Sequence, residues 1–380
     1  MQRAPTQYYA SLGANPQGSG GFSLVELMIA MTLGLIVVAG LGQLYVAGRD
    51  ANRIIETTSG LNDNGRFAAE FLARDLRLAG YFSCGGAKAN IANAVNERTF
   101  WFKLQGIEGY EGGVDTLPGA FSSFPTPLAD TDVFIIRYAD VRDLAEVSSS
   151  GFDKTNHLFT FTKPHPFATS SIAVLNDANC AQTSIFQITN SHNSNGDYDI
   201  SFAEDKDVVP GNCTTLLAGS YDCSSDSAAS GEDYATDPAD KFANASIGRF
   251  VARAFFVAND DRTNCPAAPP GCDALEDCPA LFIAGTDQAD PVAVLHDVGD
   301  MQVEYGVDDS IQVSDGQVVK PGDKTVDRYL TADAISDDLW LKVASMRIRL
   351  SLLPRIKNCP PKPFTTTVAL RNAGIIIGDW

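Results

Sequence analysis

The feature that most constrains this 380-residue chain is an apolar run near its start, from Phe22 to Ala47. Only Glu26, Gln43 and small polar residues interrupt the run. At about 1.5 Å per residue, a helix of this length crosses a hydrocarbon core of roughly 30 Å. No convincing small-residue cleavage site follows the run, so we expect an anchor that stays in a membrane rather than a secretory signal.

The helical pattern continues beyond the apolar run. A stripe of apolar or small residues recurs with the helical period, opposite charged residues. Gly80 follows the last periodic residue and is expected to end the helix. The segment from Thr57 to Gly65 is poor helix material and is expected to loosen or kink it. We predict one helix from about Phe22 to about Ala79, apolar all round at first and then amphipathic. The stripe contains Ile54, Thr58, Leu61, Gly65, Ala68, Leu72 and Ala79, widened by Phe67, Phe71 and Leu76.

The remainder of the chain is predicted to be rich in β-strands. Short β-like runs lie between loops of Gly, Ser, Asn, Asp and Pro, and several alternate apolar with polar residues. A short helix is expected to start at Asp337 or Asp338. The predicted fold class is α+β, with an antiparallel sheet packed on the amphipathic half of the long helix. The predicted strands are 132–139, 157–162, 171–175, 184–189, 248–258, 291–297, 301–307, 343–353 and 365–371.

The eight cysteines all follow the apolar run, which indicates an oxidising compartment and up to four disulfides. Zinc is disfavoured because no Cys-x-x-Cys occurs and no His pair lies near the tightest cluster. The favoured pairings are Cys213 with Cys223, a local bridge inside 265–278, and Cys84 with Cys180. The disulfide candidates are Cys84, Cys180, Cys213, Cys223, Cys265, Cys272, Cys278 and Cys359.

The charge balance is acidic, with a formal net charge of −19. This argues against nucleic acid and against electrostatic docking on anionic lipid. Two acidic, loop-like regions, 205–245 and 259–280, together hold five of the cysteines and are interpreted as disulfide-stapled insertions. Clusters at 258–264 and 306–310 offer oxygen ligands of the kind that bind Ca²⁺. No EF-hand pattern occurs, so solvated loops are favoured and no cofactor or metal site is predicted.

Catalytic patterns are weak. The histidines, His157, His165, His192 and His296, are scattered. Neither G-x-S-x-G nor H-E-x-x-H occurs, and no glycine-rich loop follows a strand to hold phosphate. We expect that the chain is not an enzyme.

Two sets of residues resemble a known family. GGFSLVELMIAM, starting at Gly20, resembles the class III signal of type IV prepilins, with a glycine, then Phe, then Glu as the fifth mature residue. The segment 62–86 resembles the helix end of PilW-type minor pilins. The runs 297–308, 338–355 and 364–372 are similar to the closing strands of that family.

The resemblance implies a processing site. A prepilin peptidase would cut between Gly21 and Phe22 and methylate the new amino terminus of Phe22. An ionised carboxylate in hydrocarbon costs about 2.5–3.5 kcal/mol on insertion scales, so Glu26 needs a partner. The amine of Phe22, one helical turn away in the same or a neighbouring subunit, supplies that partner after cleavage. The alternative is that Glu26 lies at the interface and snorkels into the headgroups.

The resemblance also implies an organisation and a role. The expected regions are a leader (1–21), a membrane-spanning half of the helix (22–48), an amphipathic half (49–80) and a β-rich domain (81–380). The chain would be anchored once in the inner membrane, with the β-rich domain in the periplasm, and later lie at the pilus tip on the cell surface. Its partners would be other minor and major pilins, the prepilin peptidase, the inner-membrane assembly platform and a tip adhesin. The expected function is to initiate or cap a type IV pilus, in support of twitching.

Two alternatives stay open. One is a minor pseudopilin of type II secretion, of the J type. The other is a pilus-tip adhesin or binding module that uses residues 90–290, which match nothing recognisable.

Overall fold

The structure is a computed structural model that separates into two units, residues 1–56 and 57–380. The residues that the structure describes are 21, 23–82, 90–96, 100–103, 105–194, 197–205, 207, 210–219, 221–223, 242–260, 278–287, 290–314, 317–320, 322–354 and 360–372.

The predicted long helix is present. Helix α1 runs from Leu24 to Leu76, so it begins in the first unit and ends in the second. Gly80 adopts a left-handed φ of 71°, as expected of a residue that terminates a helix, and its N–H donates to the Arg137 carbonyl (2.9 Å). The segment 57–65, which was expected to loosen, is helical throughout. The low helix propensity of this segment is overridden by tertiary packing, because Leu61 and Gly65 are buried in the second unit.

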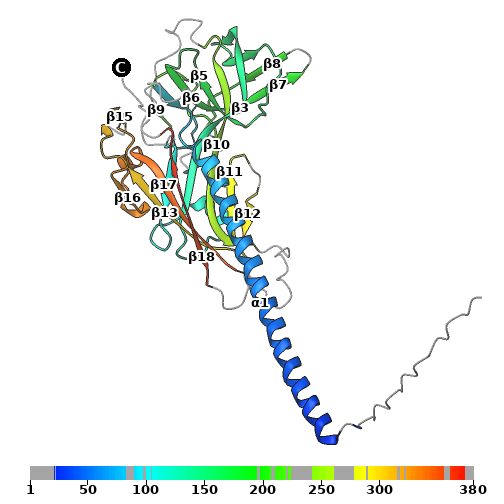
Figure 1. Cartoon of the computed structure of the whole chain (residues 1–380). Coiled ribbons are helices and arrows are strands. Elements are labelled where there is room, and N and C mark those ends of the chain that lie inside the picture. Colours follow the sequence, from blue (N-terminus) through cyan, green and yellow to red (C-terminus); the bar gives the residue numbers. More distant parts are fainter. Residues whose placement is uncertain are drawn as a thin grey trace, which may run out of the picture. The chain divides into compact units, whose positions relative to one another are not determined.

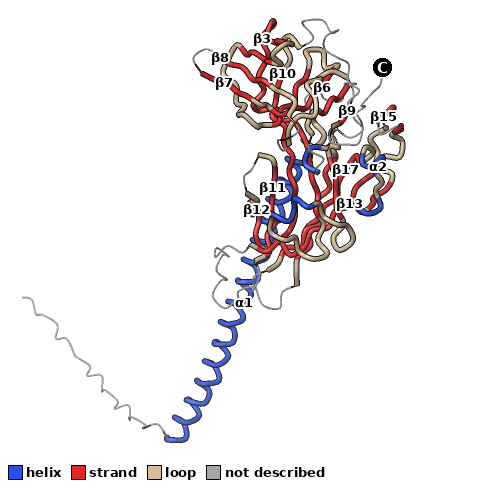
Figure 2. The backbone as a smooth tube through the Cα atoms, turned by 180° about the vertical axis from the view of Figure 1, so that it is seen from behind, coloured by secondary structure: helices blue, strands red, loops and turns tan. Residues whose placement is uncertain are grey.

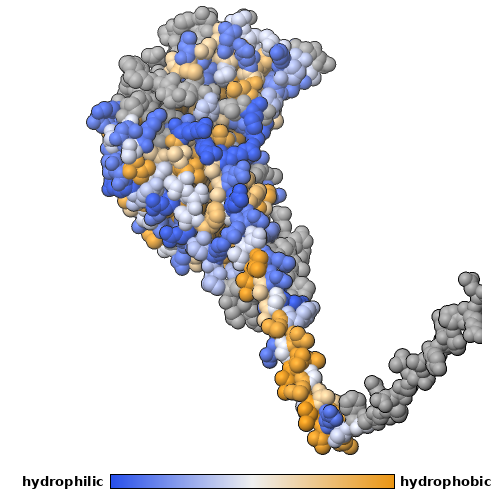
Figure 3. All heavy atoms as spheres, viewed as in Figure 1, coloured by the Kyte–Doolittle hydropathy of each residue, from blue (hydrophilic) through white to orange (hydrophobic). Residues whose placement is uncertain are grey.

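The first unit contains an exposed stretch, which we define as residues 24–56 of α1. Every side chain in it is exposed except Arg53, which is half-buried. From Leu24 to Val46 the exposed side chains are mostly large and apolar, and Figure 3 shows them as orange spheres. A helix that is apolar all round requires a non-aqueous environment.

The second unit, residues 57–380, is called the body. Here α1 buries one face, and the predicted stripe is confirmed at Leu61, Gly65, Ala68, Leu72, Leu76 and Ala79. The prediction is wrong at Ile54 and Thr58, which are exposed because burial along α1 begins only at Leu61. It is also wrong at Phe67, which lies to one side of the buried face and is 51% exposed.

The predicted antiparallel β-sheet domain is confirmed, and in the part of the chain that the structure describes its strands are divided among a large sheet, a small sheet and a separate strand pair (Figure 1). Among the described residues, the large sheet has the path β7-β8-β4-β3-β10-β5-β6-β1-β9, with β2, β11 and β12 joined at its sides. Its pairs are antiparallel except β1–β6 and β1–β9, which are parallel. The strands are β1 (Asn90–Asn93), β2 (Ile107–Tyr110), β3 (Val133–Asp153), β4 (Leu158–Phe161), β5 (Ile172–Asn176), β6 (Gln182–Gln187), β7 (Asn190–Ser194), β8 (Asp197–Ser201), β9 (Tyr221–Asp222), β10 (Ser246–Asn259), β11 (Pro279–Gly285) and β12 (Val292–His296).

The small sheet has the order β16-β13-β17-β18, and β14 pairs with β15 separately. These strands are β13 (Val298–Val307), β14 (Gln312–Ser314), β15 (Gln317–Lys320), β16 (Arg328–Leu330), β17 (Val343–Leu352) and β18 (Lys362–Ala369). The short helices are η1 (Phe100–Phe102), η2 (Gly119–Ser123), η4 (Ala332–Ala334) and α2 (Asp337–Trp340). Helix α2 starts at Asp337 as predicted, with Ser336 as its N-cap residue.

All nine predicted runs are strands, and their ends differ by at most three residues except at β3, which continues to Asp153, 14 residues beyond the predicted end at 139. The largest omission is β11, which lies between β10 and β12. Its sequence, PALFIAG, shows no alternation because all but the last residue are buried. The expected loop-like region 259–280 is therefore wrong at both ends, since Asn259 belongs to β10 and Pro279 and Ala280 belong to β11, and residues 261–277 lie outside the described residues.

The main core lies between the two sheets and α1. The inward faces of β13 and β17 alternate as predicted, with Met301, Val303 and Tyr305 buried opposite Ile348 and Leu350. A second, aromatic core fills the part of the large sheet around β4 to β8. The strands β3 and β10, seen from behind in Figure 2, contribute residues to both cores.

Candidate functional site

The predicted processing and pairing residues lie at the start of α1. Gly21 is exposed and precedes the helix, and Glu26 is exposed in its first turn. A carboxylate in the first turn interacts favourably with the helix dipole. Phe22 lies outside the described residues, so its cleavage, its methylation and its ion pair with Glu26 stay predictions.

The helix that carries these residues has the length and composition of a membrane span. It is the one such helix within the described residues, and none of its most apolar window is buried. The exposed stretch therefore presents an apolar surface that either lipid or other helices would cover. The predicted boundaries at residues 21, 48 and 80 concern processing and a membrane, and they stay predictions.

The end of α1 is held in the body by a buried ion-pair cluster. Arg253 of β10 contacts Asp75 of α1 through Nη1 (2.7 Å) and Asp287 through Nη2 (2.6 Å). Asp75 is 5% exposed, so its charge depends on this partner. The guanidinium also lies 5.9 Å from the ring centre of Tyr138. The cluster fixes the last turn of α1 against β3 and β10.

Close backbone packing fixes α1 at two further points. A Cβ at Gly65 would lie 2.5 Å from the ring of Phe364 in β18, so any larger residue there requires that ring to shift. A Cβ at Gly106 would lie 2.4 Å from the Cα of Gly80. Asn372 donates from Nδ2 to the Ala79 carbonyl (3.0 Å), which ties the residues after β18 to the end of α1.

A second buried ion pair lies under the same helix end. Arg137 of β3 is completely buried and donates from Nη2 to Glu108 (2.6 Å). Lys103 reaches the other oxygen of Glu108 (2.5 Å). Burial raises the pKa of Glu108, but the charges and hydrogen bonds of Arg137 and Lys103 outweigh it and hold the pKa below its usual range.

Sequence reasoning missed both ion-pair clusters, although a signal was present. Arg137 and Arg253 are each a cation inside a strongly apolar strand, VFIIRYA and FVARAFFVA. Arginine is almost never fully buried without a partner, so such a residue predicts a buried ion pair. The identity of the carboxylate depends on contacts distant in sequence, up to 178 residues in the case of Asp75.

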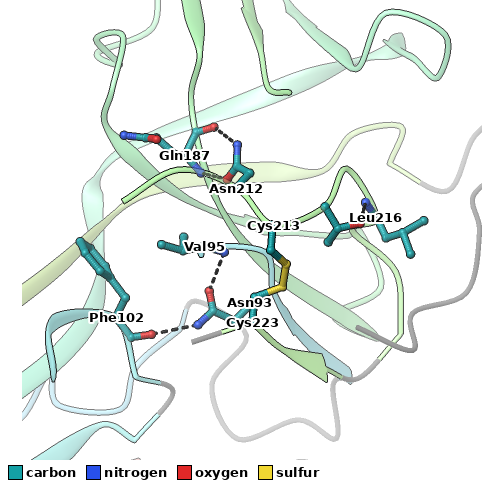
Figure 4. The surroundings of a disulfide bond; sticks show 9 residues. Asn93, Val95, Phe102, Gln187, Asn212, Cys213, Leu216 and Cys223 are labelled. Carbon is teal, nitrogen blue, oxygen red and sulfur yellow. Dashed lines mark hydrogen bonds between the residues drawn. A yellow bond between two sulfur atoms is a disulfide. The ribbon is translucent and has the colours of Figure 1, made fainter. Parts of the chain in front are cut away.

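One disulfide is placed within the described residues, between Cys213 and Cys223, and it confirms that expected pairing (Figure 4). The backbone N–H groups of the two cysteines donate to the Ala94 and Asn93 carbonyls (2.8 and 2.9 Å). Asn212, next to Cys213, pairs through its side chain with the backbone of Gln187 (2.7 and 2.9 Å). The bridge therefore holds two separate segments against β1.

The other cysteines are only partly covered. Cys180 and Cys278 are also disulfide-bonded. The remaining candidates, Cys84, Cys265, Cys272 and Cys359, lie outside the described residues. The predicted pair of Cys84 with Cys180 and the bridge inside 265–278 therefore stay predictions.

The histidines and acidic groups form no arrangement suited to metal binding in the part of the chain that the structure describes. His165 is buried, with Nε2 near the carbonyls of His192 (2.9 Å) and Asp199 (3.2 Å). In the acidic cluster 306–310, Asp308 is buried and accepts from the N–H groups of Ser310 and Lys324. Most of the cluster 258–264 lies outside the described residues.

Comparison with known families gives two matches. Residues 255–360, which include β11, β13 and β17, match the type IV pilus-assembly protein W model. Residues 17–42 match the prokaryotic N-terminal methylation motif. The search of curated proteins and the search of solved structures each gave no match.

The two matches fall on different parts of the molecule. The methylation motif covers the predicted cleavage site and the start of α1, and the second match covers the sheet residues that pack around the end of α1. Together with the long apolar helix and the β-sheet body, they match a type IV prepilin-like protein of the PilW type and support a minor pilin related to the type IV pilus.

Proposed function

We propose that this minor pilin joins a small complex that initiates or caps a type IV pilus. Prepilin peptidase cuts between Gly21 and Phe22 and methylates the new amino terminus. Before assembly, the exposed stretch is inserted in the inner membrane and the body lies in the periplasm. It then packs against the helices of other pilins, and the body becomes part of the pilus tip at the cell surface.

The observation that carries this proposal is the exposed stretch with a single acid at its start. Its apolar surface suits lipid first and a filament core later, since both are non-aqueous. Between Gly21 and Asp50 the charged side chains are Glu26 and Arg49. Glu26 lies four residues from the proposed new amine of Phe22, the spacing that places both on one face of a helix. An ion pair there would offset the cost of placing the carboxylate in an apolar environment.

The first test is mass spectrometry of the chain purified from cells that contain prepilin peptidase. We expect the mature chain to begin at N-methylated Phe22. A chain that still begins at Met1 in those cells would overturn the proposed processing, and with it the proposed assembly.

The second test substitutes Glu26 by Ala. We expect normal membrane insertion but loss of incorporation into pili, because the incoming subunit would lack its ion pair. Glu56→Ala, an exposed acid at the other end of the same stretch, is the matched control and should assemble normally. Normal piliation by the Glu26→Ala variant would mean that this acid only snorkels to the interface.

Deletion of the chain separates the pilus from secretion. We expect loss of surface pili and of twitching, with secretion of exoproteins unchanged. Loss of exoprotein release with normal pili would instead favour a minor pseudopilin of type II secretion.

A further inference from the structure

A pocket of about 590 Å³ opens in the body where β10 changes its strand partner. One edge of β10 pairs with β5 over residues 246–249 and with β11 over residues 253–259. Between these two pairings no strand of the described chain occupies that edge. The pocket lies in this gap, between Ile172 at the start of β5 and Thr286 just after β11.

The backbone of β10 forms hydrogen bonds on both sides of this gap. Ala252 exchanges two hydrogen bonds with Thr286, so its N–H and C=O point to this edge (both 3.0 Å). By the two-residue period of a strand, the N–H and C=O of Phe250 are directed to the same edge. The β5 register, which ends with Arg249 opposite Ala173, directs the Phe250 N–H at the Ile172 carbonyl, so the lining side chains offer the polar groups for a ligand.

Local backbone irregularities shape the pocket on both sides. The pairing of β10 with β3 shifts register between Ile247 and Arg249, a bulge of the kind that re-aims a side chain next to a binding site. Across the gap, Ser170 has a left-handed φ of 69°, which is unusual for a residue with a side chain. Its N–H donates to Ile188 (2.8 Å), which holds the turn in this conformation. Such strained positions concentrate at binding sites.

The lining has one cation, several hydroxyls and an apolar wall. Arg249 donates from Nη2 to the Pro166 carbonyl (3.3 Å), which leaves most of its five donors for another partner. Ser170, Ser171 and Thr286 add hydroxyl groups. The apolar wall is built by Phe102, Ile172 and Phe250, which belong to one buried cluster. The carboxylate of Asp287 also lines the pocket, already paired with Arg253.

We propose that this pocket binds a sugar that carries a carboxylate, such as a uronate. The guanidinium of Arg249 would pair with the sugar carboxylate, the geometry in which arginine is most selective. The serine and threonine hydroxyls would exchange hydrogen bonds with the sugar hydroxyls, and the C–H face of the ring would lie on the apolar wall. A cavity of this size suits a single sugar or two linked sugars.

This inference deepens the binding-module alternative and does not depend on a role in initiating the pilus. Most of the lining lies between residues 102 and 250, outside both regions that match known families. The proposed sugar site therefore gives a role to a part of the chain that neither family match covers.

The test uses the full-length protein in a detergent without a sugar headgroup. Saturation-transfer NMR is recorded with glucuronate and, as its neutral match, with glucose. We expect glucuronate to bind with a Kd on the order of a millimolar and glucose to bind at least about tenfold more weakly, because only glucuronate pairs with Arg249.

The variants make the assignment specific. Arg249→Gln should weaken glucuronate binding at least about tenfold and leave glucose binding unchanged. Ser171→Ala should weaken both sugars by a few-fold, roughly the value of one neutral hydrogen bond. Arg349→Gln, an exposed cation on β17 outside the pocket, is the matched control. Unchanged melting temperatures exclude misfolding as the cause.

Two results overturn the proposal. One is the absence of saturation transfer from either sugar to the folded wild-type protein. The other is equal binding of glucuronate by the wild type and Arg249→Gln. Neither result bears on Phe22 processing or on assembly through Glu26, so failure of this proposal is distinguishable from failure of the proposed function.

Discussion

The two parts of α1 share one secondary structure and differ in what surrounds them. In the exposed stretch, residues 24–56, no described side chain is fully buried. In the body, residues 57–76 of the same helix bury six positions, from Leu61 to Leu76. The two parts of the helix therefore differ in the source of the contacts that stabilise them. The body depends on contacts within its own chain, and the exposed stretch depends on a medium or partners that another molecule supplies.

This comparison predicts where substitutions act. Changes around residues 57–76 should alter the free energy of unfolding of the body. Changes in the exposed stretch should leave that free energy unchanged and should alter only membrane insertion or assembly.

Loss of Arg253 should have the largest effect. Arg253→Met leaves the buried carboxylate of Asp75 and the half-buried carboxylate of Asp287 without their cation, and removal of one partner of a buried ion pair costs about 3–5 kcal/mol. Denaturant unfolding of the body, followed by tryptophan fluorescence, measures the change. Arg49→Met removes a cation from the exposed stretch and should leave the transition in place. An equal loss in both variants would contradict the division.

The disulfide should contribute next. The double variant Cys213→Ala, Cys223→Ala opens a loop with a sequence separation of 10, which should cost the body about 2–3 kcal/mol. The exposed stretch contains no cysteine, so its helix should not respond. Denaturant unfolding measures the loss of stability in the body, and circular dichroism in detergent measures the helix content of the exposed stretch. An unshifted transition would show that the bridge does not hold β1 in place.

Gly65 should show a smaller effect of packing. Gly65→Leu forces a side chain against the ring of Phe364 and should lower the unfolding free energy by about 1–2 kcal/mol, after allowing for the better helix propensity of leucine. Gly48→Leu is the matched control in the exposed stretch, where a Cβ meets nothing within 4 Å. It should leave the transition of the body unshifted. Equal stability of wild type and Gly65→Leu would mean that the ring moves aside without cost.

The sequence predicted those elements whose pattern is local. The alternation in 301–307 and 346–352 identified β13 and β17 with the correct inward faces, since each has one buried and one polar face. The period of 3.6 identified the buried face of α1 but not its first residue, because the start of burial depends on where the body begins. β11 was missed because it is buried on both faces and its apolar run has no period.

The site was predictable only where chemistry follows a fixed spacing. Gly21, Phe22 and Glu26 form a short motif, and the family match to residues 17–42 covers it. The ion pairs of Arg253 and the pocket at β10 depend on which strands meet far apart in the chain. No local sequence pattern predicts that the strand partner of β10 changes from β5 to β11 between residues 249 and 253.

The smallest expected effect is a pH dependence confined to the body. Glu111 follows β2, and its Oε2 is shielded from water and has no hydrogen-bond partner among the described residues. Burial, reinforced by the charge of Asp132, raises the pKa of Glu111 to about 6. The folded state therefore holds this proton more tightly than the unfolded chain, in which the pKa is near 4.5. The resulting stability is complete below pH 4.5 and is lost as the pH rises through 6.

Glu111→Gln should remove this dependence. The variant stays neutral at every pH, so at pH 8 it should be more stable than wild type by about 1 kcal/mol or less, a value reduced for the partial solvent exposure of the group. The difference should vanish near pH 4. Urea unfolding at both pH values measures it, with Glu56→Gln as the control in the exposed stretch. A difference that is the same at pH 4 and pH 8 would show that the substitution acts through packing and not through the proton.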